Sequence, residues 1–459
     1  MRRVALALIL FVALPVAAQN TDIESMSGLQ FNFGNPGARA LGMGGAFIAL
    51  ADDASAAEAN PAGLSILRKP EISIEGRNYL EQQILTTSGT FPNLERTAFK
   101  HYSDRVEIAF ASAVVPVGKF TLGAYYHQPL KNVGAGSVVP QRNEFTGQIE
   151  KDVPNFYLPR DGTPVNKTQC EAIRKQQNDF FACLEYTLNP FITAVDVQQR
   201  TFGMAGAYSF GKLSVGATVR YQRFRESAFT YRVTPTFDFS SIAVQATGEI
   251  KNGELSVKDE SDVTFTAGFK YAPTDKFSIG GVYKMGPEFV APTFIASPGT
   301  NFQFQKLADT TFHVPDIAGL GVSFRPIPVL TLNFDAVHVT YSNLVDNFVA
   351  TNADVRSEES PFFAADVTEL RFGAEYFFST KIPFALRAGY WRDPAHSIEY
   401  RGALNAPELV AEAVLFPKTD AQNHYSVGAG FAWPRFQVDL AYDTSENYKV
   451  GSVTLVTRF

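Results

Sequence analysis

Residues 436–443, FQVDLAYD, alternate apolar and polar side chains. The same alternation recurs in residues 213–222 and 370–376. Because successive side chains of a β-strand point to opposite faces, each stretch predicts a strand with one apolar and one polar face. A soluble β-sandwich would produce the same pattern, so alternation alone does not separate a soluble protein from a membrane protein.

The spacing of the strands favours a membrane protein. Short turns join the strands in pairs at residues 116–119, 210–212, 273–276, 326–328, 380–382 and 433–435. Long polar segments separate the pairs at residues 83–104, 130–194, 227–260, 287–315, 343–365 and 393–422, with a short loop near Ser445. This combination is the signature of an outer-membrane barrel, and one strand on each flank gives about fourteen strands. The predicted fold is therefore all-β, a transmembrane antiparallel β-barrel over residues 70–459 with its long loops outside.

The aromatic residues support this interpretation. The chain has 40 Phe and 18 Tyr, although hydrophobic residues make up an ordinary 45%. Aromatic residues at the predicted strand ends suggest two interfacial girdles, namely Tyr126, Tyr221, Tyr283, Tyr390 and Tyr442 at one rim and Phe210, Phe378, Trp433 and Phe459 at the other. The last strand ends on Phe459, which resembles the signal that the outer-membrane barrel assembly machinery reads. We therefore expect this machinery as a partner during biogenesis.

The N-terminus predicts an export signal. Arg2 and Arg3 precede the apolar run 4–14, and the small residues up to Ala18 suit cleavage, so residues 1–18 are expected to be a signal peptide. The run is shorter than the about 20 apolar residues of a membrane-spanning helix. An uncleaved interfacial anchor is the alternative. Since no later stretch is long and apolar enough for a helical span, membrane insertion has to use strands.

Residues 19–69, here called the hatch, are expected to form a small helical plug inside the barrel lumen. Residues 37–46 are rich in glycine and alanine, which allows close packing. Residues 52–59 predict a short helix that begins with acidic residues, and Pro61 ends it because proline disfavours helical geometry at Asn60. A phosphate-binding loop is the other interpretation of the glycines, but no Lys-Ser/Thr pair follows them.

The remaining composition excludes several classes of site. Cys170 and Cys183 lie close together in an exported chain and are expected to form a disulfide. Neither a second cysteine pair nor a neighbouring histidine suggests a metal site, and no cofactor is expected. A net charge of −6 without basic runs argues against nucleic acid. The histidines are scattered along the chain and no serine nucleophile motif accompanies them, so no catalytic site is expected.

Charged residues in the predicted strands point toward the lumen. By alternation these are Glu75, Arg77, Glu107, Arg220, Lys270, Arg325, Arg371, Glu375, Arg387 and Asp439. Either one or two arginines bind a ligand carboxylate, for which Arg220, Arg371 and Arg387 are the candidates, or the charges pair with one another and hold barrel and hatch together. Phe334 and Val337, on opposite faces near His338, predict a bulge or the wall of an apolar pocket.

The hatch and several strands resemble the long-chain fatty acid transporter family (FadL-type). The matching residues, in the family's order, are 44–46, 51–54, 60–62, 314–316, 319–326, 330–332, Asp335, 386–390, 427–430 and 439–442. The resemblance implies a fourteen-stranded barrel with a plugged lumen that takes hydrophobic ligands from outside and releases them laterally without an energy source. It also implies a gating role for Asn60, Pro61 and Ala62. Phe31 and Phe33 would line the ligand pocket or simply anchor the hatch.

We therefore expect a monomeric outer-membrane transporter without enzymatic activity. Its expected ligands are hydrophobic small molecules, with long-chain fatty acids first and aromatic hydrocarbons second. Membrane lipid and lipopolysaccharide are its expected surroundings. The alternatives are an interaction or shuttle protein of a secretion system and a general porin, against which the plug argues.

Overall fold

The computed structural model describes residues 33–85, 99–138, 156–157, 164–165, 167–177, 184–185, 191–238, 245–256, 260–297, 303–345, 362–402, 418–446 and 448–459. The predicted signal peptide 1–18, Phe31 and Cys183 lie outside these residues, and for Cys170 only the backbone is described. The export signal and the disulfide therefore stay predictions. Among the helices within the described ranges, none has the length and hydropathy of a membrane span.

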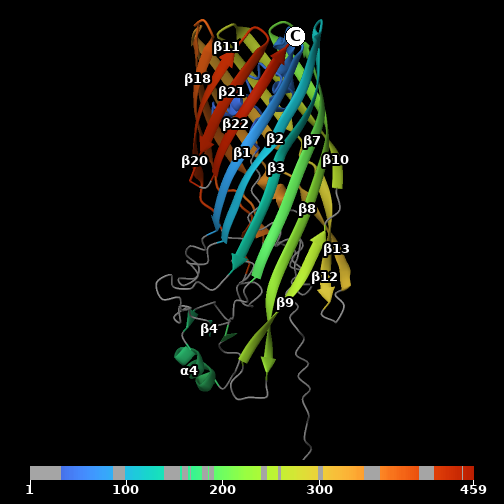
Figure 1. Cartoon of the computed structure of the whole chain (residues 1–459), viewed down its shortest axis with the longest axis vertical. Helices are drawn as coiled ribbons and strands as arrows, with labels where there is room; N and C mark the ends of the chain where they lie inside the picture. The colour runs from blue at the N-terminus through green and yellow to red at the C-terminus, as the bar shows by residue number, and fades with distance from the viewer. Residues whose placement is uncertain are drawn as a thin grey trace, which may run out of the picture.

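Fourteen strands form one closed antiparallel barrel (Figure 1). Each pairs with the next barrel strand along the chain, and β22 pairs back with β1. The strands are β1 (Glu71–Leu85), β2 (Phe99–Val117), β3 (Phe120–Val138), β7 (Phe191–Ser209), β8 (Leu213–Asp238), β10 (Glu260–Thr274), β11 (Phe277–Lys284), β14 (Ile317–Ile327), β15 (Leu330–Val339), β17 (Val367–Phe378), β18 (Phe384–Asp393), β20 (Gln422–Ala432), β21 (Phe436–Thr444) and β22 (Tyr448–Arg458). The predicted fold is confirmed.

Smaller elements extend the long-loop end of the barrel, away from the C-terminus. Figure 1 labels five of them there: β4 (Phe156–Tyr157), α4 (Lys167–Gln177), β9 (Gln245–Ser256), β12 (Glu288–Ser297) and β13 (Gln303–His313). β9 pairs with the far part of β8, outside the closed ring. The other short elements are β5 (Pro164–Val165), β6 (Leu184–Glu185), η3 (Tyr341–Leu344), β16 (Phe362–Phe363) and β19 (Glu399–Tyr400).

Backbone pairing extends beyond the predicted strand ends. β7 and β8 remain paired as far as Phe191 with Arg232, both in segments expected to be loops. β12 and β13 form a hairpin inside the expected loop 287–315. Outside the membrane neither strand face meets lipid, so the apolar–polar alternation stops while the ladder continues. The predicted loop boundaries were wrong for this reason.

The two faces of the wall differ as the alternation predicts. In β21, Leu440 and Tyr442 are exposed on the outside, whereas Asp439 and Asp443 are buried inside. Among the predicted lumen charges, Arg325 keeps the most exposure, with 44% of its side chain accessible, and it lies 3.7 Å from Asp52 of the hatch.

β15 has a regular register from end to end. Phe334 is exposed on the outside and Val337 is buried inside, and the pairing with β14 and β17 passes both residues without a shift. The predicted bulge is therefore wrong. Val337 and Val339 are buried on the inner face, and the alternative interpretation, the wall of an apolar pocket, remains a prediction.

Aromatic side chains gather at the short-turn end of the barrel. The ring centroids of Phe120 and Tyr208 are 4.5 Å apart, as are those of Phe378 and Phe384. Phe210 is exposed beside Tyr208, at 4.6 Å between centroids. Phe210 and Phe378 belong to the rim predicted from the sequence, where aromatic rings suit the membrane–water interface.

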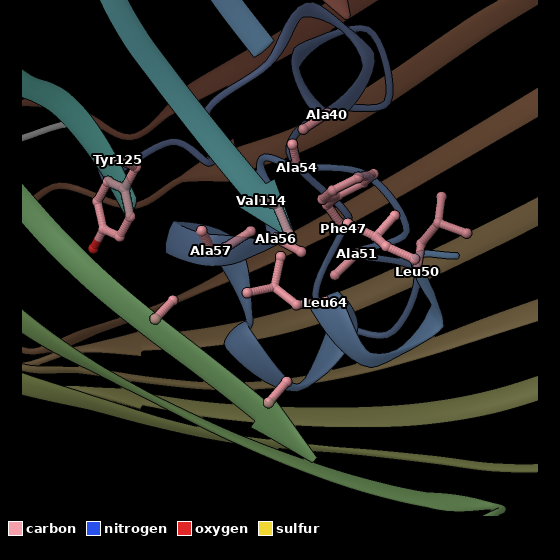
Figure 2. Close-up of a cluster of buried hydrophobic side chains, with 14 of the residues drawn as sticks. Ala40, Phe47, Leu50, Ala51, Ala54, Ala56, Ala57, Leu64, Val114 and Tyr125 are labelled. Carbon is pink, nitrogen blue, oxygen red and sulfur yellow. The ribbon is translucent and has the colours of Figure 1, made fainter. Parts of the chain in front are cut away.

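The described part of the hatch, residues 33–69, packs inside the barrel. It contains α2 (Ala38–Leu41), α3 (Ala56–Ala59) and η1 (Pro61–Ile66). Figure 2 shows its small apolar core, in which Phe47, Leu50 and Leu64 pack with alanines and with wall side chains such as Val114. The helix predicted over 52–59 is shorter than expected. A turn precedes it, in which the Asp53 carboxylate accepts a hydrogen bond from the Ser55 backbone (2.9 Å).

Candidate functional site

Asn60 joins the hatch to the barrel wall. Its wholly buried side chain accepts a hydrogen bond from the Ala62 backbone N–H (3.2 Å), which caps η1. Its amide nitrogen donates to the backbone carbonyls of Ile48 (3.0 Å) and of Phe269 in β10 (3.1 Å). Because both its donor and its acceptor atoms are used, the amide holds a fixed position. The predicted break is confirmed, since Asn60 is extended (φ −157°, ψ 103°) and Pro61 begins η1.

Two glycines of the wall allow this close approach. A β-carbon at Gly216 of β8 would collide with the backbone of Pro61 and Ala62, and one at Gly268 of β10 would collide with the Asn60 side chain. Larger residues at either position would push η1 away from the wall. The gating role of Asn60, Pro61 and Ala62 remains a prediction.

We expect Asn60→Ala to loosen η1 without preventing barrel assembly. The variant loses a helix cap worth about 1 kcal/mol, and two buried carbonyls lose a donor at about 1–3 kcal/mol each. Hydrogen exchange in Pro61–Ile66 should therefore accelerate at least about tenfold. The control Asn423→Ala removes an amide that bonds Tyr390 on the exposed surface and should leave this exchange unchanged. Wild-type exchange in Asn60→Ala would contradict the anchoring role.

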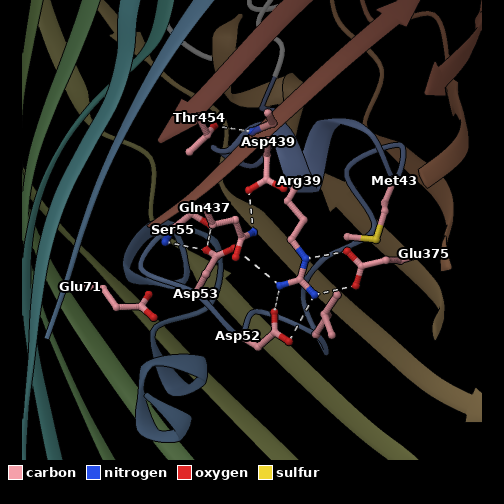
Figure 3. Close-up of polar contacts among 12 residues, drawn as sticks. Arg39, Met43, Asp52, Asp53, Ser55, Glu71, Glu375, Gln437, Asp439 and Thr454 are labelled. Carbon is pink, nitrogen blue, oxygen red and sulfur yellow. Dashed lines mark hydrogen bonds and ion pairs between the residues drawn. The ribbon is translucent and has the colours of Figure 1, made fainter. Parts of the chain in front are cut away.

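Arg39 of α2 ties the hatch to the wall at the short-turn end of the lumen (Figure 3). Its guanidinium pairs with Asp52 inside the hatch and donates to Glu375 of β17 at 2.8 and 2.9 Å. Arg387 of β18 reaches the same Glu375 (2.7 Å) and Asp439 of β21 (2.7 Å). We call these five residues the floor network. Its charges, which are mostly or wholly buried, offset one another's desolvation, and the network links the hatch to three strands.

Glu58 of α3 is a second buried charge of the hatch. It accepts hydrogen bonds from Tyr125 Oη of β3 and Lys284 Nζ of β11 (3.0 Å), while Arg220 of β8 and His127 of β3 lie 3.9 Å away. Burial alone would raise its pKa, but the charges of Lys284 and Arg220 lower the pKa of Glu58 to about 2. The carboxylate is therefore ionised at neutral pH and attracts three wall strands to α3.

The three arginines predicted to bind a ligand have protein partners. Arg371 donates through Nε to Glu369 on its own strand (3.0 Å). Arg220 donates to the Met285 carbonyl, and Arg387 belongs to the floor network. These contacts fit the paired-network interpretation of the lumen charges. Ligand binding by Arg220, Arg371 and Arg387 remains a prediction.

Apolar side chains gather in the lumen toward the long loops. The buried Tyr341 ring of η3 stacks on His396 (centroids 4.3 Å) and lies 6.1 Å from Phe33. Three further buried side chains of this apolar layer, Ile317, Val339 and Val367, are cross-strand partners. Tyr341 and His396 were not among the predicted site residues, because they lie at or inside segments expected to be loops. The pocket role of Phe33 remains a prediction.

β2 and β3 separate partway along the wall. Their ladder has eight pairs, from the short turn at residues 117–120 to the pair Phe110–His127, and it goes no further in the described residues. Beyond that pair, β2 stays bonded to β1 along its whole length and β3 to β7. A strand that crosses the hydrocarbon core needs about 9–11 residues, so this gap begins in the half of the membrane nearer the long loops.

A bulge in β3 accompanies the gap. Its register with β7 shifts between His127 and Leu130, so that Gln128 and Pro129 face the single residue Arg200. Proline cannot donate a ladder hydrogen bond and is confined to edges and bulges. Pro129 was therefore a usable sequence signal for this interruption, although the interruption was not predicted.

An apolar outer surface and a polar, plugged lumen define a membrane-spanning barrel that carries an internal plug. The family model described as "Outer membrane protein transport protein (OMPP1/FadL/TodX)" matches residues 185–453, and the chain belongs to this family. The predicted family and the predicted location in the outer membrane are confirmed. This is a family of transport proteins for hydrophobic compounds.

Solved structures share the fold at low sequence identity. A Pseudomonas aeruginosa FadL homologue superimposes with a TM-score of 0.59 at 13% identity, covering 94% of this chain and 99% of that one. The Ralstonia pickettii toluene transporter TbuX superimposes with a TM-score of 0.52 at 16% identity, covering 93% of this chain and 99% of that one. The CymD monoaromatic hydrocarbon channel superimposes with a TM-score of 0.53 at 16% identity, covering 94% of this chain and 99% of that one. No curated protein matches the sequence.

Proposed function

We propose that this protein takes up hydrophobic compounds by passive diffusion and releases them sideways into the membrane between β2 and β3. The proposal depends chiefly on one observation, the end of the β2–β3 ladder at Phe110 and His127. The floor network supports it, because mostly buried ion pairs hold the hatch across the direct route to the periplasm. A gap in the wall then offers the alternative exit.

Long-chain fatty acids are the first ligands that we propose, and aromatic hydrocarbons are the second. Each methylene group removed from water contributes about 0.8 kcal/mol, so an apolar layer can concentrate either class without an energy source. The layer around Tyr341 offers such a surface. The ligand-facing candidates are Phe31, Phe33, Arg220, Arg371 and Arg387.

The proposed organisation is a signal peptide at residues 1–18, the hatch at 19–69 and the barrel at 70–459. We propose that the protein works as a monomer without enzymatic activity, surrounded by membrane lipid and lipopolysaccharide and inserted by the barrel assembly machinery. The buried packing of the hatch argues against a general porin. No observation favours the shuttle alternative.

Deleting the gene tests the proposal. We expect the deletion strain to take up radiolabelled oleate or toluene several-fold more slowly than the parent, and a plasmid copy to restore the rate. Glucose uptake is the control and should not change, since it does not require an apolar route. Parental uptake of both hydrophobic probes would sink the transport proposal. A stable complex with a secreted protein, without an uptake defect, would favour the shuttle.

A further inference from the structure

We propose that Glu107 of β2 and Gln128 of β3, with Tyr126 of β3, form a side-chain latch that closes the gap between the two strands and opens to let a ligand out. This inference rests on the proposed lateral release. It adds the residues that would control that release.

The latch begins where the backbone ladder ends. Gln128 Nε2 donates to Glu107 Oε2 across the gap (3.2 Å), and Tyr126 Oη donates to Gln128 Oε1 (2.8 Å). Gln128 is 6% exposed, so these protein contacts replace hydrogen bonds to water. One hydrogen bond, from Gln128 to Glu107, thus bridges a part of the wall that the strand ladder leaves unbridged, and Tyr126 holds the Gln128 side chain.

The bulge explains how Gln128 reaches this position. In a regular strand consecutive side chains point to opposite faces, yet His127 and Gln128 are both buried. The extra residue of a bulge re-aims one side chain in this way, and the register shift between His127 and Leu130 locates the bulge here. The interruption that opens the ladder therefore also supplies the side chain that closes the gap.

Apolar side chains border the latch on both sides, and on the lumen side the Glu58 carboxylate also lies 3.9 Å from His127. On the lumen side, the wholly buried Phe110 ring lies 5.9 Å from the His127 ring. On the outer side, Tyr126 lies 5.5 Å from Phe202, and Ile108 is exposed. A hydrophobic molecule that leaves the lumen would meet the latch as a polar barrier between Phe110 on the inside and Phe202 and Ile108 on the outside.

Such a latch can open without unzipping the barrel. Rotation of the Gln128 side chain breaks two side-chain hydrogen bonds, and Glu107 and Tyr126 stay on their own strands. Opening a paired part of the wall would instead expose backbone donors and acceptors to lipid, where they find no water. Opening the gap therefore costs less than opening a paired part of the wall.

Reversible cross-linking tests the latch. A Glu107→Cys/Gln128→Cys variant is expressed in the deletion strain and joined by a short bis-methanethiosulfonate, and peptide mass spectrometry verifies the link. We expect the link to lower the uptake of radiolabelled oleate or toluene at least tenfold and dithiothreitol to restore it. The control Ala113→Cys/Ala124→Cys joins two residues paired inside the intact ladder and should keep its uptake when linked.

Gln128→Ala, without any reagent, should raise uptake about threefold to tenfold.

The outcomes separate the latch from the proposed function. Full uptake by the linked variant would overturn the latch, and so would failure of the link to form or wild-type uptake by Gln128→Ala. In those cases uptake by the wild type would still support transport. If the wild type and the reduced variant both fail to take up either probe, the proposed function itself is wrong.

Discussion

Replacing Arg39 with methionine is expected to let ions pass a lumen that the hatch otherwise closes. Arg39 pairs with Asp52 and Glu375, and Asp53 lies 3.8 Å away, so the variant leaves three carboxylates without this cation. Burial lowers the pKa of Arg39, but Asp52 and Glu375 raise it by more, to well above its ordinary value. The side chain is therefore charged at any pH that the cell meets.

The expected effect is large because the pairs are mostly buried: 14% of the Arg39 side chain is accessible, with 15% of Asp52 and 12% of Glu375. Removing one partner of a buried ion pair costs about 3–5 kcal/mol. Since about 1.4 kcal/mol corresponds to a factor of ten, the population of barrels with a displaced hatch should rise at least about a hundredfold. Single-channel recording in planar lipid bilayers measures this change as more frequent conducting events.

Arg401→Met is the matched control for Arg39→Met. Arg401 also pairs with a carboxylate, that of Glu399, but 51% of its side chain is exposed, so its loss should cost about 1 kcal/mol or less. A correctly folded Arg39→Met barrel with the conductance of the wild type would show that the apolar core, rather than the floor network, holds the hatch.

The barrel could be predicted because the membrane imposes the same requirement on every strand. Lipid on one side and a polar lumen on the other fix the alternation, and residues 436–443 occupy the faces that it assigns, with Leu440 outside and Asp439 inside. Beyond the membrane, a strand no longer needs alternating apolar and polar side chains. For this reason the ladder of β7 and β8 up to Phe191 and Arg232 left no readable pattern.

The contacts of the hatch could not be predicted, because they depend on its position inside the lumen. Glu58 meets Tyr125 and Lys284, which are 67 and 226 residues away in the sequence, and no local pattern relates these three residues. Alternation places Lys284 and Tyr125 on the inner face of their strands. Which of the inner residues meet α3 depends on the register of the barrel and the depth of the plug.

The gap between β2 and β3 could be predicted only in part. Pro129 marks an interruption in β3, because it lacks an N–H donor. The residue itself does not indicate which neighbour of β3 loses its pairing. That depends on the bulge, which keeps β3 bonded to β7 and leaves the side toward β2 open.

Glu58→Gln is expected to release α3 from the wall at neutral pH and to remove an acid sensitivity of the wild type. The pKa of Glu58 is lowered from 4.5 to about 2, so its ionised form stabilises the packed hatch. At about 1.4 kcal/mol per pKa unit, the contribution is about 3 kcal/mol. Because the folded-state pKa is the lower one, this contribution is complete above about pH 4.5 and is lost as the pH falls toward 2.

Hydrogen exchange of the α3 and η1 amides, corrected for the intrinsic effect of pH, measures this difference. At pH 7 the variant should exchange about a hundredfold faster than the wild type, and the two should converge between about pH 4.5 and 2. Glu446→Gln changes an exposed carboxylate and should follow the wild type throughout. A constant ratio of the Glu58→Gln and wild-type rates down to pH 2 would mean that Glu58 acts through shape and hydrogen bonding. Its charge would then not be what holds β3, β8 and β11 to the hatch.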